Sequence, residues 1–476
     1  MNVLLNYNFN AEDIADGDFT RLFQTRRRDA SFAFVYEQDG ATYAIRDHLG
    51  IVPLYYRISE DGARWSTHLS ELVRPGDRLN PDGVNAFLSL GTPRLMPLIE
   101  GIGIVPPGAV IKLMPNGRTE TVYQYRIQPH PIPLATSSRA LTDSAAALFK
   151  TAMERLVRHE TVGLYLSGGI DSALIGIHLR DLGVEVNAYT SAPWGSGSSE
   201  IAYSKQNAAT IGARRQSLDL LETERYPALY HALPELYGIP HATTTALGVA
   251  SLWLNTPIAG EQQVFFGQNS DTMTCSVPAQ YNTVLLNALP RALRSRLHRS
   301  QRYDDVVLNY LSFSQVIDPA RYPALPLPYD PEALTPIQLI TLAGMLLVHT
   351  PSDGEVLSQP AIRRNIRISN PYYDVDLVEF CLGIPLRHRL ALSRESKLGL
   401  ALEKHVFRQM ALRYLPRDVV YRKKAFTVPF NRDERSRTFT RTLPEALGNR
   451  SLNNFNQRFA AGILQRWMEQ QEIVPD

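Results

Sequence analysis

The sequence is poor in cysteine and has no long apolar run. Its 476 residues include two cysteines, Cys275 and Cys381, too few for a framework of disulfide bonds. No uninterrupted apolar stretch has the length needed to cross a bilayer, and the N-terminal stretch lacks the basic region and apolar core of a signal peptide. We therefore expect a reduced, cytoplasmic protein that has no membrane partner.

A surplus of charge of one sign is also missing. The chain has 49 Lys and Arg against 47 Asp and Glu, so its formal net charge is +2. Proteins that bind nucleic acid usually carry a basic patch and a clearly positive balance, so we expect no nucleic-acid partner. The length predicts two or three domains, each large enough to bury a core.

The first part of the chain shows the alternation and turn residues of short β-strands. Two apolar runs, residues 32–36 and 42–45, flank Gln38-Asp39-Gly40, a combination typical of a β-hairpin. Further short runs of the same kind follow. We therefore expect a mostly β domain over residues 1–128.

A proline-rich linker over residues 129–140 is predicted to lead into a second domain over residues 141–476. In this second part, buried-strand patterns such as residues 186–190 and 264–266 are separated by helical patterns. Strands interleaved with helices predict a parallel, doubly wound sheet with helices on both faces. The expected fold class is therefore α/β.

The most informative stretch is VGLYLSGGIDSAL, residues 162–174. An apolar strand pattern ends at Ser167-Gly168-Gly169, and a helical pattern begins around Asp171 and Ser172. A strand, a glycine turn and a helix N-terminus together favour an anion, because amide groups point outward and the helix dipole favours negative charge. The alternative is a serine-rich turn that caps a helix and binds no ligand.

This turn has neither the lysine of a Walker A loop nor the GxGxxG pattern of a dinucleotide turn. It matches SGGxDS, the pyrophosphate loop of enzymes that split ATP into AMP and pyrophosphate. An acid at the position of Asp171 suits Mg²⁺ on the phosphates, since that ion prefers oxygen ligands.

Several separated motifs, in the same order along the chain, make it resemble the asparagine synthetase family, which includes β-lactam synthetases, carbapenam synthetases and lasso-peptide cyclases. Each motif alone is weak, and their shared order carries the resemblance. The matching segments are Arg46-Asp47-His48-Leu49-Gly50-Ile51-Val52-Pro53-Leu54-Tyr55-Tyr56, Glu100-Gly101 with Pro106-Pro107-Gly108, the SGGIDS loop, residues 267–271, Asn370-Pro371-Tyr372-Tyr373-Asp374, and Lys404 with Arg422-Lys423-Lys424.

The resemblance implies that the first domain is a shortened relative of an Ntn glutamine amidotransferase domain. Family members that hydrolyse glutamine use an N-terminal cysteine, but position 2 here is Asn2, and neither cysteine lies in this domain. Without a thiol nucleophile we expect no glutaminase activity. In this respect the chain is similar to the ring-closing relatives.

The resemblance also implies how ATP and Mg²⁺ are bound. The loop and its neighbours are expected to hold ATP, and two acids are expected to share Mg²⁺. Glu200 has an alternative interpretation as a first-turn acid favoured by the helix dipole. The implied nucleotide residues are Ser167, Gly168, Gly169, Asp171, Ser172, Glu200 and Gly267, and the implied metal ligands are Asp171 and Asp271.

Four residues are candidates for catalysis. Lys404 and Lys424 match the family's two lysines, and Lys424 is the candidate for stabilising an oxyanion, whereas Arg422 and Lys423 beside it are expected to be solvated. Gln268 stands where asparagine synthetases have a Glu and β-lactam synthetases a Tyr, so it can orient a substrate but not act as a base. Glu355, alone or with Asp353, becomes the candidate base, the alternative being a solvated loop carboxylate.

The expected function is an ATP-dependent amide ligase that forms AMP and pyrophosphate without hydrolysing glutamine. Its expected partners are ATP and a small molecule or precursor peptide that bears a carboxylate and an amine, with other biosynthetic enzymes as further candidates. We favour lactam or macrolactam closure in natural-product biosynthesis. One alternative is a tRNA-modifying enzyme with the same loop, which would need a basic patch or a cysteine pair. Another is a degenerate nucleotide-binding protein, because Gln268 and Thr272 replace expected acids.

Overall fold

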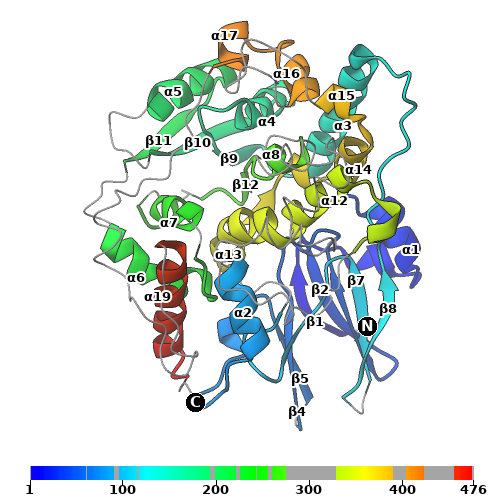
Figure 1. Cartoon of the computed structure of the whole chain (residues 1–476), viewed down its shortest axis with the longest axis vertical. Helices are drawn as coiled ribbons and strands as arrows, with labels where there is room; N and C mark the ends of the chain where they lie inside the picture. The colour runs from blue at the N-terminus through cyan, green and yellow to red at the C-terminus, as the bar shows by residue number, and fades with distance from the viewer. Residues whose placement is uncertain are drawn as a thin grey trace, which may run out of the picture.

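The computed structural model describes most of the chain, and Figure 1 shows that its first part and the remainder, called the first and second domains below, build separate sheets. Among the described helices, none is long and apolar enough to span a bilayer. The described residues are 2–60, 62–90, 96–114, 117–192, 199–220, 226–242, 244–255, 260–274, 328–389, 404–422 and 455–473.

The first domain consists mainly of two antiparallel sheets. A five-stranded sheet has the order β1-β2-β3-β7-β8, and a three-stranded sheet has the order β5-β4-β6. The mostly β character predicted for this region is confirmed. The strands are β1 (Asn2–Tyr7), β2 (Ala33–Gln38), β3 (Ala41–Arg46), β4 (Tyr55–Ser59), β5 (Gly62–Ser66), β6 (Ile102–Ile104), β7 (Ala109–Leu113) and β8 (Thr119–Gln124), with helix α2 (Pro81–Leu90) beside them.

The predicted hairpin is formed by β2 and β3. The two strands pair from Ala33 with Arg46 to Gln38 with Ala41. Asp39 and Gly40 at the turn have φ values of +52° and +72°. Two successive positive φ angles are the requirement of the two-residue turn that matches strand twist, and Asp-Gly meets it with little strain.

The Arg-Asp-His-Leu-Gly motif holds the loops of this domain together. Arg46 is fully buried, and its guanidinium donates hydrogen bonds to the backbone carbonyls of Gly50, Val52 and Val105 at 2.7–2.8 Å. The carboxylate of Asp47 accepts from the amides of the same turn, including Val52 at 3.0 Å. A buried charge is tolerated when it is fully hydrogen-bonded, so this motif is a scaffold.

The second domain is built on a parallel sheet of five strands in the order β11-β10-β9-β12-β13. After β9, the chain places β10 and β11 on one side of this strand and later places β12 and β13 on the other side. The order in which strands are added therefore reverses between β9 and β12. Open α/β sheets bind ligands at the carboxyl ends of strands at such a switch. The strands are β9 (Thr161–Tyr165), β10 (Glu185–Ala192), β11 (Arg215–Leu220), β12 (Gln263–Phe265) and β13 (Arg367–Ser369).

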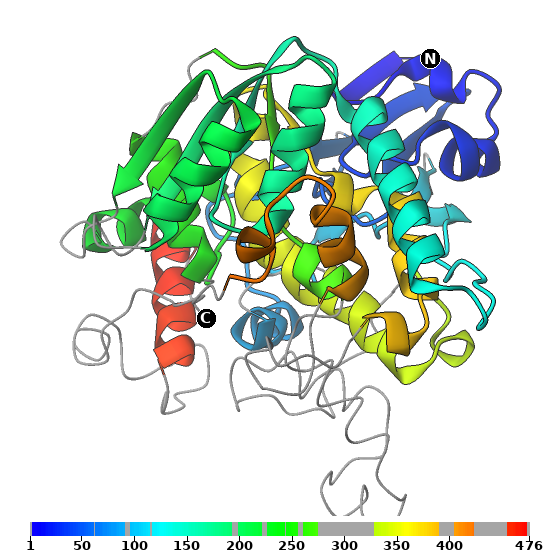
Figure 2. The same cartoon turned by 90° about the horizontal axis from the view of Figure 1, so that it is seen from above.

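Helices cover both faces of this sheet, so the predicted doubly wound α/β domain is confirmed. In Figure 1, α4 and α5 lie above the strands, and α7 and α13 lie below them. Seen from above in Figure 2, the orange α16 and α17 lie over the middle of the molecule. The helices that matter here are α3 (Ser138–Leu156), α4 (Ile170–Asp181), α5 (Ser199–Ile211), α6 (Tyr226–Tyr237), α7 (Thr244–Asn255), α8 (Ser270–Met273), the π-helix η8 (Gly344–Glu355), α13 (Val356–Arg363), α14 (Val375–Gly383), α16 (His405–Ala411), α17 (Arg417–Val420) and α19 (Phe455–Gln470).

The segment between β8 and α3 has no regular secondary structure and runs beside α14. The amide of His130 donates to the carbonyl of Glu379 at 2.8 Å, which ties this segment to α14. Ser137 then caps α3, because its hydroxyl accepts from the amide of Ala140. Near the other end of the chain, α19 packs against both α6 and α2 and so contacts both domains.

Buried ion pairs join the two domains at the start of α14. Arg28 of the first domain donates to Asp376 at 2.7 Å and to Glu379 at 2.8 Å. Arg155 of α3 donates to Asp374 at 2.6 Å and to the second oxygen of Asp376 at 3.0 Å. Asp376 is thus shared by one arginine from each domain.

Candidate active site

The glycine turn connects β9 to α4 and is held in shape by its own serines. The hydroxyl of Ser172 accepts a hydrogen bond from the amide of Ser167 at 3.0 Å, and the hydroxyl of Ser167 accepts from the amide of Gly169 at 3.1 Å. Asn207 of α5 donates to the carbonyl of Ser167 at 3.0 Å. Both serine hydroxyls, predicted to cradle pyrophosphate, therefore bond within the turn.

Helix α5 lies directly against this turn. A Cβ at Gly168 would come within 2.5 Å of the Cβ of Tyr203, so only glycine fits there. The amide of Gly168 donates to the carboxylate of Glu200 at 2.7 Å. The close approach of α5 is thus one reason for the glycine, and Glu200 places a negative charge where the turn favours an anion.

The two acids predicted to share Mg²⁺ lie at the same edge of the sheet. Asp171 is in the first turn of α4, which follows β9, and Asp271 is in the first turn of α8, which follows β12. Their turns touch, since a Cβ at Gly267 would lie 3.4 Å from the amide nitrogen of Ser172. Strands β9 and β12 are neighbours in the sheet, so the topology brings these distant acids together.

A buried lysine bridges the two acids. The Nζ of Lys404 lies 2.6 Å from Asp171 Oδ2 and 2.7 Å from Asp271 Oδ1, and the hydroxyl of Ser270 is 3.4 Å away. Burial alone would lower the pKa of Lys404, but the charges of the two carboxylates outweigh it and raise the pKa above its usual value. Lys404 is therefore a charged ammonium in a pocket with two carboxylates.

The Asn-Pro-Tyr-Tyr-Asp motif forms hydrogen bonds to both turns that bear the acids Asp171 and Asp271. Asn370 donates to the backbone carbonyl of Gln268 at 2.9 Å, and the hydroxyl of Tyr372 donates to the backbone carbonyl of Asp171 at 3.1 Å. Asn269, which follows Gln268 in the turn before α8, has a φ of +73°, a conformation that asparagine tolerates better than most residues. The motif that looks like a family signature thus positions the acids.

The donor set of this site suits a hard divalent cation. Asp171 Oδ1 is buried and has no hydrogen-bond partner among the residues that the structure describes. No group of three or more His, Cys, Asp or Glu that could hold a metal occurs in that part of the chain. Mg²⁺ is commonly held by one or two carboxylates, with waters and substrate phosphates completing its shell, so Asp171 and Asp271 fit that ion.

Three further predicted residues lie near this edge of the sheet. Gly267 and Gln268 form the half-buried start of the turn before α8. Glu355, the last residue of η8, is fully buried, and its Oε2 lies 3.6 Å from Nε2 of the equally buried His241. The alternative of a solvated loop carboxylate is therefore wrong. Thr350 in the same helix accepts from Asn269 at 3.3 Å, which connects η8 to the acid-bearing turn.

Arg422 is a residue whose place the sequence did not indicate. Its guanidinium carbon lies 4.3 Å from the ring centre of Tyr203, and its Nη2 donates to Gln206 at 3.0 Å. The expectation that Arg422 is solvated is therefore wrong, because it is half-buried against the helix that covers the glycine turn. Lys423, Lys424 and Cys275 lie outside the described residues, as does the side chain of Asp353.

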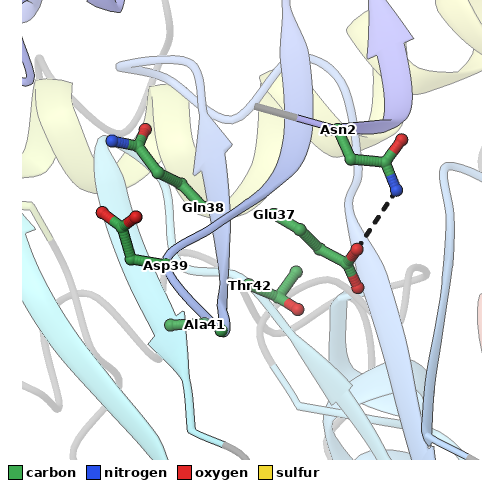
Figure 3. A pocket seen from close by; sticks show the side chains of 7 residues that line it. Asn2, Glu37, Gln38, Asp39, Ala41 and Thr42 are labelled. Carbon is green, nitrogen blue, oxygen red and sulfur yellow. Dashed lines mark hydrogen bonds between the residues drawn. The ribbon is translucent and has the colours of Figure 1, made fainter.

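The first domain carries a polar pocket near its first strand. Figure 3 shows an open polar pocket at the end of the β2–β3 hairpin, where the side chain of Asn2 donates to Glu37 at 3.1 Å. The other side chains that line it are short or polar and include no thiol. The amide of Asn2 thus bonds to the neighbouring strand β2.

Comparisons with known proteins agree with this geometry. The family model described as asparagine synthase matches residues 144–473, which is more than half of the chain. The glutamine-hydrolysing asparagine synthetase 1 of Bacillus subtilis (strain 168) is 24% identical over 200 residues. That match covers 41% of this chain and 31% of the relative, so the chain aligns with about a third of that protein's length.

Proposed function

Because the chain belongs to the asparagine synthase family, we propose that it is an ATP-dependent ligase that forms a carbon–nitrogen bond. A substrate carboxylate attacks the α-phosphate of ATP, which gives an acyl-adenylate and pyrophosphate, and an amine then displaces AMP. The observation that carries this proposal is the convergence of Asp171, Asp271 and Lys404 beside the glycine turn at the switch point of the sheet.

Each part of the site has a role in this reaction. The glycine turn and the N-terminus of α4 bind phosphate through amides and the helix dipole. Asp171 and Asp271 would hold Mg²⁺, which supplies charge neutralisation on the phosphates when it is bound. The ammonium of Lys404 lies close enough to move onto the same phosphates. Lys424 is proposed, on the resemblance alone, to stabilise the developing oxyanion.

Glu355 is proposed to take the proton from the attacking amine. It lies beside His241, and its helix contacts the turn that bears Asp271 through Thr350. Since Glu355 is fully buried, substrate entry has to open a path to it. Gln268 orients the substrate by hydrogen bonds, because an amide does not accept a proton at neutral pH.

The amine is proposed to come from the substrate itself or from ammonia rather than from glutamine. This finer proposal is supported by the absence of a cysteine among residues 1–274, which include the whole first domain. A chain that does not release ammonia from glutamine suits ring closure, in which one molecule carries both carboxylate and amine. We therefore propose lactam or macrolactam formation in natural-product biosynthesis, on a small molecule or precursor peptide supplied by other biosynthetic enzymes.

Two alternatives remain as candidate functions. A catalytically degenerate nucleotide-binding protein is favoured by Gln268 and by the buried Thr272, which replace acids expected in this run. A tRNA-thiolating enzyme would need a reactive thiol, but burial raises the pKa of Cys381 to about 12, so that thiol does not ionise at neutral pH.

Exchange of labelled pyrophosphate into ATP tests the proposal. The purified chain with Mg²⁺ is offered a panel of carboxylates that includes aspartate and β-amino acids, and Asp171→Asn serves as the inactive control. Exchange that depends on a carboxylate supports the ligase, whereas no exchange and no AMP with any carboxylate favours the degenerate protein. Glutamate release from glutamine is measured in parallel, and robust release would overturn the proposed source of the amine.

A further inference from the structure

Lys404 occupies the position between the two carboxylates that would hold a divalent cation. Its ammonium reaches one oxygen of each acid, at 2.6 Å and 2.7 Å. A lysine that only binds phosphate does not need to contact both metal-ligating acids. Here the contact is as short as a charge-assisted hydrogen bond becomes.

Electrostatics explains why an ammonium is held there. Two carboxylates that share a site repel each other, and a cation between them offsets that repulsion. The side chain of Lys404 is 7% exposed, so its charge is poorly compensated by water and depends on the two acids. The ammonium and the two carboxylates therefore attract one another at short range.

The backbone holds Lys404 in this place. Its φ is +56°, in the left-handed region that is uncommon for lysine, and α16 begins at the next residue. Helix α16 packs against α3 and α4, so the lysine is anchored to the helix that bears Asp171. The side chain of Asp271 is 67% exposed, against 19% for Asp171, so the site is open to solvent on the Asp271 side.

We propose that Lys404 is a resident counter-ion that competes with the divalent cation, so that the protein binds the metal only together with the nucleotide. When the metal–nucleotide complex enters, the metal takes the two carboxylates and the ammonium moves onto the phosphates that the metal brings. The carboxylate pair then has a cation beside it both before and after binding. This inference rests on the proposed function in that the arriving ligand is a nucleoside triphosphate.

Binding of Mn²⁺, followed by electron paramagnetic resonance, tests the inference without turnover. The wild-type chain should bind Mn²⁺ weakly alone and at least about tenfold more tightly with α,β-methylene-ATP. The variant Lys404→Met should bind Mn²⁺ without nucleotide at least about tenfold more tightly than wild type, because the ammonium that competes for the two carboxylates is removed. The matched variant Lys404→Arg keeps the charge and should not gain this site.

Adding Asp271→Asn to Lys404→Met should abolish the gained site, which assigns it to the carboxylate pair. Circular dichroism checks that each variant folds, and Lys404→Gln replaces the Met variant if that one does not. The inference is overturned if wild-type protein binds Mn²⁺ equally tightly with and without nucleotide, or if the folded neutral variants gain no site. Pyrophosphate exchange is measured separately from Mn²⁺ binding. Absence of exchange would contradict the proposed ligase, whereas the Mn²⁺ results alone decide whether Lys404 competes with the metal.

Discussion

The carboxylate of Glu200 accepts a hydrogen bond from the backbone amide of Gly168 across 2.7 Å. This contact places a negative charge on the turn that is shaped to bind one. A phosphate that approaches this amide has to displace the carboxylate or share the turn with it. The amide of Gly168 thus already has a hydrogen-bond acceptor within the protein.

We expect Glu200→Gln to bind ATP about tenfold more tightly than wild type, because the amide oxygen keeps the hydrogen bond while the repulsion between carboxylate and phosphate is removed. Isothermal titration calorimetry with α,β-methylene-ATP and Mg²⁺ measures this change. Glu185→Gln, at the opposite end of β10 from the turn and exposed, is the matched control. Weaker binding by Glu200→Gln would instead show that the carboxylate itself contacts the nucleotide.

Removal of Arg422 should impair nucleotide binding through α5. Its guanidinium stacks on Tyr203, which packs on Gly168, so Arg422→Ala loosens the helix that covers the turn. We expect the KM for ATP in pyrophosphate exchange to rise about tenfold, with a smaller rise for Arg422→Lys. The control is Arg417→Ala, which removes a similar stacking contact with Tyr421. An equal rise in the KM for ATP in Arg417→Ala would show that Arg422 has no specific effect on nucleotide binding.

The ion pairs between the domains should contribute strongly to stability. Arg28→Met leaves Asp376 and Glu379 without their bonds to Arg28 in a largely buried interface. Breaking one side of a buried pair costs about 3 kcal/mol, so we expect the free energy of unfolding to fall by that amount in urea titrations. Arg21→Met, whose pair with Asp16 is exposed and 3.6 Å long, should change it far less. Similar losses in both variants would contradict this account.

His48 should make the first domain sensitive to acid. Burial lowers the pKa of His48 from 6.5 to about 3, and its Nε2 lies 2.9 Å from the carbonyl of Phe23. Because the pKa is lower in the folded protein, the stability that neutral His48 contributes is present above pH 6.5 and is lost as the pH falls toward 3. The loss attributable to His48 at pH 5 is about 2 kcal/mol relative to neutral pH.

Urea titrations at pH 7 and pH 5 measure this contribution of His48. The variant His48→Gln keeps a donor for the carbonyl of Phe23 and does not titrate, so its stability should fall less between the two pH values than that of wild type. The difference between the two proteins isolates one histidine from the other groups that titrate in this range. Parallel pH profiles for both proteins would show that His48 is not the cause.

Local features of this protein could be predicted from the sequence because short stretches determine them. The Asp39-Gly40 hairpin depends on two residues that accept positive φ, and the SGGIDS turn depends on a strand, glycines and a helix start that are adjacent in the chain. The parallel sheet follows from alternating strands and helices.

Contacts between distant segments could not be predicted in this way. The Arg422-Lys423-Lys424 run looks like a solvated basic segment, and only the folded chain places Arg422 against Tyr203 and Gln206 of α5. The sequence left open whether Glu355 lies at the site or in solvent, and only the structure shows that it is buried beside His241. Such pairings depend on the full set of packed helices, about which spacing along the chain carries no information.

The sequence by itself determined that the chain forms a nucleotide-type turn on a parallel sheet, because periodicity and glycine positions restrict the local backbone. The tertiary structure alone decided that Lys404 lies between Asp171 and Asp271 and that Glu200 caps the amide of Gly168. The physical reason is that electrostatic pairing acts through space over a few ångströms, and folding brings together charges that lie far apart along the chain.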